Sequence, residues 1–199
     1  MAPAKLTAEA THDRSEESRT EGLGGALGGL RETGARLRFL LVFWALSGAL
    51  LFAHHYPYPQ GTWGDRFVTG YCQACAWLVG GILRTFGDPV LVYGDTVVHS
   101  ARMSITKDCD GLELVGFLVS AVVAFPSTWK ERSRGVAFAL AAAIGLNLVR
   151  LCTLYVILAR WPSLFEFFHV QAWQVLSFVA GLALFGAWVR ILRAERRPG

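Results

Sequence analysis

Long apolar runs separated by short polar segments occupy most of the chain after residue 36. A helix that crosses a bilayer needs about 20 mainly apolar residues. The pattern therefore predicts four transmembrane helices, although Pro126 makes the second one short. The expected spans are about residues 37–56, 110–126, 135–159 and 169–190. The fold class that we predict is an all-α polytopic membrane protein.

Residues 67–86, FVTGYCQACAWLVGGILRTF, are also long enough to span, but the charges of the later loops oppose this. Basic segments tend to stay in the cytosol. Three basic segments lie on the same side of the membrane only if residues 67–86 do not cross it. They are the arginines before the first span, the segment WKERSR (129–134) and the tail RILRAERRPG (190–199). We therefore predict an outer interfacial or re-entrant helix here, with both termini in the cytosol.

Polar segments define the rest of the organisation. Residues 1–36 are polar and then glycine-rich, which predicts a disordered cytosolic tail. In the run VLVYGDTVVHSARMSI, apolar and polar residues alternate in short stretches on both sides of Gly94-Asp95. This pattern predicts a short extracytoplasmic β-hairpin. Residues 37–192 would form one membrane domain, followed by a basic cytosolic tail over 193–199.

Composition agrees with this organisation. The chain has 199 residues, of which 53% are hydrophobic and 17% charged, values typical of a small polytopic membrane protein. The net charge is +4, but the basic residues flank apolar segments. Their placement indicates membrane orientation and contact with lipid, and we expect no nucleic-acid partner. Four scattered cysteines do not suggest a disulfide scaffold.

The stretch KDCDGLE (107–113) places Cys109 between two acids where an apolar run begins. At a helical rise of about 1.5 Å per residue, Cys109, Arg150 and His169 lie about 25, 22 and 31 Å from the cytosolic edge. Three predicted spans thus bring a thiol, a guanidinium and an imidazole to the outer part of the membrane. An arginine inside an apolar helix costs about 2.5–3.5 kcal/mol on insertion scales and usually marks function.

These groups form a candidate acyl-transfer set. Cys109 would be the nucleophile, and His169 the general base that later protonates a leaving amine. Arg150 would favour the thiolate or stabilise an oxyanion. Glu113 would position Arg150 or a substrate group, or be a plain helix-start carboxylate. Asn147 would orient Arg150 from the same helix face, or bond to a neighbouring helix.

Trp173 and Gln174 follow His169 and are candidates for lining a substrate groove. The other interpretation of Trp173 is an aromatic anchor at the membrane interface.

Other function classes stay open. Cys72-Gln-Ala-Cys75 has the spacing of a membrane thiol–disulfide oxidoreductase, although the chain has no second such pair. Zinc binding by Cys72 and Cys75 with His54, His55 or His99 is a further alternative. A non-enzymatic small transporter or assembly subunit would also explain an intramembrane arginine.

Four motifs resemble the exosortase/archaeosortase family, most closely its exosortase H branch. They are KDCDGLE, the AFPSTW…R run after the second predicted span, NLVR (147–150) and FEFFHVQAWQ (165–174). The resemblance covers about residues 37–192. It implies a multi-pass cysteine peptidase or transpeptidase of the bacterial inner membrane with a periplasmic active site.

The resemblance also implies the substrate and the roles. Substrates would be exported proteins that end in a sorting signal of the IPTLxxWG kind, a transmembrane helix and a basic tail. Cys109 would be the nucleophile, His169 the acid/base and Arg150 the transition-state stabiliser. Apart from the resemblance, we expect no cofactor and no metal. Asp110 departs from the family pattern, which often has Asn or Ser there.

Overall fold

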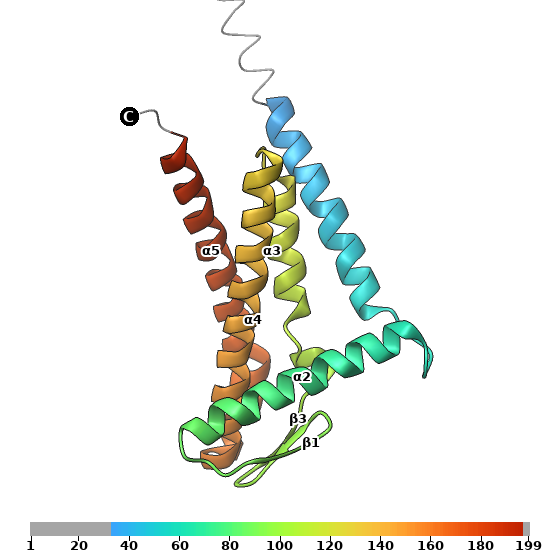
Figure 1. Cartoon of the computed structure of the whole chain (residues 1–199), viewed down its shortest axis with the longest axis vertical. Helices are drawn as coiled ribbons and strands as arrows, with labels where there is room; N and C mark the ends of the chain where they lie inside the picture. The colour runs from blue at the N-terminus through green and yellow to red at the C-terminus, as the bar shows by residue number, and fades with distance from the viewer. Residues whose placement is uncertain (1–32, 197–199) are drawn as a thin grey trace, which may run out of the picture. The chain divides into compact units, whose positions relative to one another are not determined.

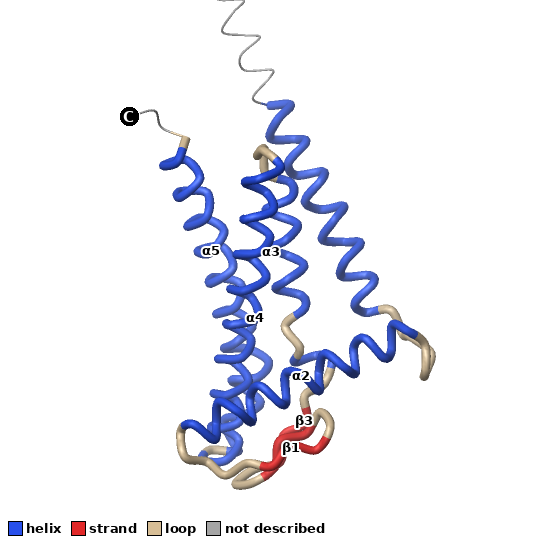
Figure 2. The backbone as a smooth tube through the Cα atoms, in the orientation of Figure 1, coloured by secondary structure: helices blue, strands red, loops and turns tan. Residues whose placement is uncertain are grey.

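The computed structural model describes residues 33–196, which are mostly helical (Figures 1 and 2). The chain divides into two compact units after Val42, and the unit from Phe43 onward holds all the labelled elements together with the last part of the helix Thr33–His55. The predicted disordered tail (1–36) lies outside the described residues, except that residues 33–36 begin a helix. The predicted basic tail is helical up to Glu195, and residues 197–199 lie outside the described part.

The labelled elements follow a simple order from α2 to α5. They are α2 (Trp63–Thr85), β1 (Leu91–Tyr93), β2 (Thr96–Val98), β3 (Arg102–Ser104), a 3₁₀ turn (Lys107–Cys109), α3 (Leu112–Ala124), α4 (Trp129–Arg160), a second 3₁₀ turn (Pro162–Leu164), a π-helix (Phe167–Ala172) and α5 (Trp173–Glu195). An unlabelled helix, Thr33–His55, precedes them.

Three helical stretches of the described chain are long and apolar enough to cross a membrane. They are Thr33–His55, α4 and the continuous stretch Pro162–Glu195. The prediction of four transmembrane helices is therefore not confirmed. The second predicted span corresponds to α3, which has 13 residues and a length of about 20 Å. That length falls short of the hydrocarbon core of about 30 Å.

The ends of α3 have local causes. Gly111 precedes it with φ +74, a left-handed conformation that interrupts helical geometry. Pro126 follows Phe125, whose extended backbone ends the helix. The helical run predicted over residues 110–126 is therefore shorter at both ends, and Cys109 lies in a separate turn before it.

The segment WKERSR is not a loop between helices, as the hydrophobicity pattern suggested. It forms the first turns of α4, because Thr128 and Glu131 make a capping box. The backbone N–H of Thr128 donates to Glu131 Oε2 at 2.7 Å, and the N–H of Glu131 donates to Thr128 Oγ1 at 3.4 Å. A T-x-x-E signal was therefore present in the sequence.

The predicted extracytoplasmic hairpin is a three-stranded antiparallel sheet in the order β1-β2-β3. Val97 on the central strand pairs with Val92 on one side and Met103 on the other. The third strand extends the hairpin because Val97 and Met103 are both buried against the core.

Helix α2 packs against α4 and the sheet, and it runs across the bundle at the end where the sheet lies (Figure 1). It begins at Trp63, four residues before the predicted start, where Thr62 caps it. Among the described helices α2 is not one of the candidate spans. Its location at a membrane surface stays a prediction.

Two apolar clusters form the core. The first joins α2, the sheet and the 3₁₀ turn of Cys109 to α4 and α5, and the second joins α3, α4 and α5. Close helix packing depends on Gly135, where an added Cβ would lie 2.7 Å from the Trp188 ring. The first cluster fixes the Cys109 turn beside the same parts of α4 and the π-helix that carry Arg150 and His169.

Candidate active site

The thiol of Cys109 lies within hydrogen-bond distance of an imidazole from a distant part of the chain. Its Sγ atom is 2.8 Å from Nε2 of His169, although 60 residues separate them. Cys109 ends the 3₁₀ turn, where its backbone N–H donates to the Thr106 carbonyl at 2.9 Å. Its side chain is 8% exposed. An imidazole at this distance is positioned to accept the thiol proton.

His169 lies in the π-helix Phe167–Ala172. Such wider turns are rare and occur often at functional sites. The His169 ring stacks on Phe165, with ring centroids 5.3 Å apart and an interplanar angle of 18°. The stack and the Cys109 contact together restrict the orientation of the imidazole.

Arg150 reaches the same site from α4. Its Nη2 atom donates to the backbone carbonyl of His169 at 3.5 Å. Its Nε atom is buried and has no hydrogen-bond partner within the described structure. The side chain lines a pocket of about 230 Å³. A guanidinium with an unsatisfied donor that contacts the residue paired with the thiol is a candidate to bind a developing oxyanion.

Asn147 fixes the backbone next to the thiol. Its Nδ2 atom donates to the carbonyl of Asp110 at 2.7 Å, and the amide is buried. Gly111 lets the two approach, because a Cβ at that residue would lie 2.5 Å from Cγ of Asn147. The structure thus places Asn147 against the Cys109 loop, whereas the sequence left open whether it orients Arg150 or bonds to a neighbouring helix.

We expect Gly111→Ala to destabilise the fold and to reduce activity. The left-handed φ and the Asn147 contact both oppose a methyl group, at a cost of about 1–3 kcal/mol. Gly94→Ala is the matched control, since Gly94 has φ +60 but a Cβ added there would meet no atom within 4 Å. Denaturant unfolding in detergent would measure both. Equal losses in the two variants would contradict the close-packing argument.

Asp110 is 1% exposed. Its Oδ1 atom accepts the backbone N–H of Leu112 at 2.9 Å and lies 3.8 Å from Nε2 of His54. Burial raises the pKa of the Asp110 carboxyl, while the Leu112 hydrogen bond and His54 oppose that shift. Burial thus disfavours the charged form of this carboxyl relative to an exposed aspartate.

The structure separates the remaining predicted site residues. Gln174 lines the same pocket as Arg150 and Asn147, as does Glu113. Glu113 pairs with His55 at 3.3 Å, so Arg150 is not its ion-pair partner. Trp173 is buried at 6% exposure in the first core cluster. Its ring lines a different, apolar pocket of about 490 Å³.

Two residues near the site, Phe165 and Lys107, were not singled out from the sequence, and His54 was considered only as a zinc ligand. Phe165 supports the His169 ring, and His54 contacts Asp110. Lys107 lines the pocket and donates to the Tyr56 carbonyl at 3.0 Å. Phe165 precedes His169 by one helical turn, which is a signal that the sequence offered.

Cys72 and Cys75 belong to the same buried apolar cluster as Cys109. Both thiols are buried on α2, at 4% and 3% exposure, and neither is in a disulfide. Burial raises the pKa of Cys72 to about 12 and also raises that of Cys75. Thiol exchange needs an accessible thiolate, so this environment disfavours the oxidoreductase interpretation. Among the described residues, the candidate metal-binding cluster consists of His54, His55 and Glu113. It includes neither Cys72 nor Cys75, the cysteines of the zinc alternative.

Comparison with known proteins identifies the family of this chain. No curated protein and no solved structure significantly matches the chain. The family model described as transmembrane exosortase (Exosortase_EpsH) matches residues 26–192. This match covers most of the chain and agrees with the apolar helices of the described part. The chain therefore belongs to the transmembrane exosortase family and is a membrane protein.

Proposed function

We propose that the protein is a membrane-embedded cysteine peptidase or transpeptidase that cleaves the C-terminal sorting signal of exported proteins. The observation that carries the proposal is the 2.8 Å distance between Cys109 Sγ and His169 Nε2. Membership in the exosortase family supports the same chemistry. The neighbouring guanidinium of Arg150 completes a nucleophile, an acid/base and an oxyanion donor.

The proposed reaction begins when His169 Nε2 takes the proton of the Cys109 thiol. The thiolate attacks the carbonyl carbon of the scissile peptide bond, and the negative charge moves to the carbonyl oxygen. Arg150 stabilises that oxygen through its N–H groups. His169 then protonates the leaving amine, the C–N bond breaks, and a thioester to Cys109 remains. Water or an acceptor amine releases the product by attacking this thioester.

The pocket of about 230 Å³ is the proposed position of the residues around the scissile bond. Its lining combines Arg150 and Gln174 with the apolar side chains of Leu114 and Phe178. A mixed lining of this kind suits a short motif that joins a polar segment to an apolar helix. The transmembrane helix of the substrate would pack along the bundle and fix the depth of the scissile bond.

The proposed location is the bacterial inner membrane, with the active site on the periplasmic side and both termini in the cytosol. Arginines support this orientation, because Arg134, Arg190 and Arg193 lie at the opposite ends of α4 and α5 from the candidate site. Positive charge at helix ends favours the cytosolic side. The proposed partners are exported proteins with a sorting signal, a transmembrane helix and a basic tail.

A thioester intermediate tests this proposal. The protein and a tailed substrate, both in detergent or nanodiscs, would be mixed, quenched in acid at early times and digested for mass spectrometry. We expect the newly formed carboxyl end of the substrate to be attached to Cys109 and to be removed by hydroxylamine. Cleavage with an adduct on another cysteine, or with no adduct at any time, would contradict the assignment.

A further inference from the structure

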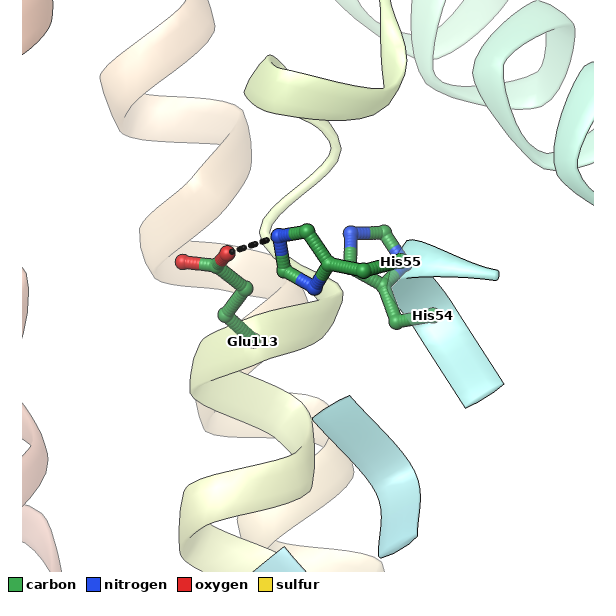
Figure 3. Close-up of side chains that lie close together, drawn as sticks. All are labelled: His54, His55 and Glu113. Carbon is green, nitrogen blue, oxygen red and sulfur yellow. Dashed lines mark ion pairs between the residues drawn. The ribbon is translucent and has the colours of Figure 1, made fainter. Parts of the chain in front are cut away.

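Two adjacent imidazoles approach α3 from the end of helix Thr33–His55 (Figure 3). His54, His55 and Glu113 each offer one donor atom, and these three atoms lie within 4.8 Å of one another. We propose that His54, His55 and Glu113 form a binding site for a divalent transition-metal cation, with zinc as the test ion. The proposed site contains none of the three proposed catalytic residues.

The contacts of His55 are the first argument. Its Nδ1 atom lies 3.1 Å from the Leu51 carbonyl, which can only accept a hydrogen bond. Nδ1 therefore carries the proton, and in a neutral ring Nε2 presents a lone pair. That lone pair faces Oε1 of Glu113 at 3.3 Å. Two acceptors at this distance require a cation between them or an additional proton on the ring or on the carboxylate.

The 3.3 Å separation also fits a metal ion. Zinc–nitrogen and zinc–oxygen bonds of about 2.0–2.1 Å in tetrahedral geometry place neighbouring donor atoms about 3.4 Å apart. The side chains of His55 and Glu113 are 61% and 48% exposed, so both can adjust without disturbing the core.

His54 supplies the second, independent argument. Its side chain is 9% exposed, and Asp110 Oδ1 lies 3.8 Å from its Nε2 atom. Its Nδ1 atom is buried and has no hydrogen-bond partner in the described part of the protein. Metal-binding histidines usually direct their second ring nitrogen at a carboxylate or carbonyl, as His55 does at Leu51. Asp110 places a buried carboxyl group beside His54, which favours a cation there.

The donor set indicates the class of cation. Two imidazoles and one carboxylate suit zinc and neighbouring transition metals, whereas magnesium and calcium prefer oxygen ligands. Three protein ligands leave a tetrahedral position for water or another small ligand. Glu113 and Arg150 both line the pocket proposed to hold the residues around the scissile bond, so this open position would lie near that pocket.

Zinc binding should be measured by calorimetry and by metal analysis on Cys109→Ala protein without a histidine tag. This background removes the thiol beside His169, which is a competing ligand. We expect one equivalent of zinc that excess magnesium does not displace. His55→Ala and Glu113→Ala, each added to this background, should weaken binding at least about tenfold.

His99→Ala is the matched control. His99 also faces a carboxylate, since its Nε2 atom lies 3.7 Å from Asp88 Oδ1. Among the described residues, no third metal-binding side chain joins this pair in a candidate cation site. We expect this variant to bind zinc like the parent. Absence of zinc binding by the parent, or equal affinity in the His55 and Glu113 variants, would overturn the proposal. Because binding is measured without the nucleophile, neither result depends on the peptidase assignment.

Discussion

Cys109→Ala should abolish cleavage of a tailed substrate, with a loss of at least about 10³-fold in rate. The variant lacks the sulfur that would form the thioester, whereas an alanine fits the buried turn without adding volume. Cleavage should be followed by the size of the substrate in cells or in detergent. Solubility and melting temperature should stay close to those of the parent protein.

Two controls separate this result from general sensitivity to cysteine loss. Cys152→Ala makes the same substitution on α4, at a thiol that lines the apolar pocket of Trp173. The double variant Cys72→Ser with Cys75→Ser removes the pair whose thiols burial keeps protonated. Both controls should cleave normally. An inactive double variant together with an active Cys109→Ala would favour the thiol–disulfide oxidoreductase instead.

Arg150→Ala should lower kcat by about 10²–10³-fold, as the loss of an oxyanion donor does in other acyl-transfer enzymes. KM should change little, because the donor acts mainly on charge that develops in the transition state. Arg150→Lys should recover part of the rate, since it keeps the charge but loses the planar guanidinium. Initial rates at several substrate concentrations would separate the two parameters.

Chemical rescue makes the Arg150 test specific. Free guanidinium added to Arg150→Ala should restore part of kcat, since the deleted side chain leaves space beside the pocket. Arg160→Ala on the same helix is the control and should retain full activity, because Arg160 lies exposed at the end of α4. A variant that loses only substrate affinity, or that guanidinium does not rescue, would indicate a structural role for Arg150.

Much of the architecture could be predicted from local patterns. Apolar length identified the helices Thr33–His55, α4 and the stretch that contains α5. Alternation on both sides of a glycine turn identified β1 and β2. The third strand was missed because the connection that precedes it, residues 99–101, contains no glycine to mark a turn. The position where α4 starts was also missed, because hydrophobicity alone does not register a capping box.

The candidate site, too, could be predicted from the sequence only in part. Residue type and helix depth selected Cys109, Arg150 and His169 as groups at a similar level of the bundle. Depth says nothing about the rotation of a helix, so the 2.8 Å contact of Cys109 with His169 could not be derived from it. The π-helix that carries His169 changes that rotation, and hydrophobic periodicity does not predict such a turn.

The sequence by itself determined the membrane class, most helix positions and the choice of three candidate site residues, because hydrophobic length and residue chemistry are local properties. Tertiary structure alone decided which atoms meet. The close approach of Gly111 to Asn147, the pairing of Glu113 with His55 and the contact of His54 with Asp110 all join residues distant in the chain. Such contacts depend on how helices pack and rotate against one another, which apolar periodicity does not specify.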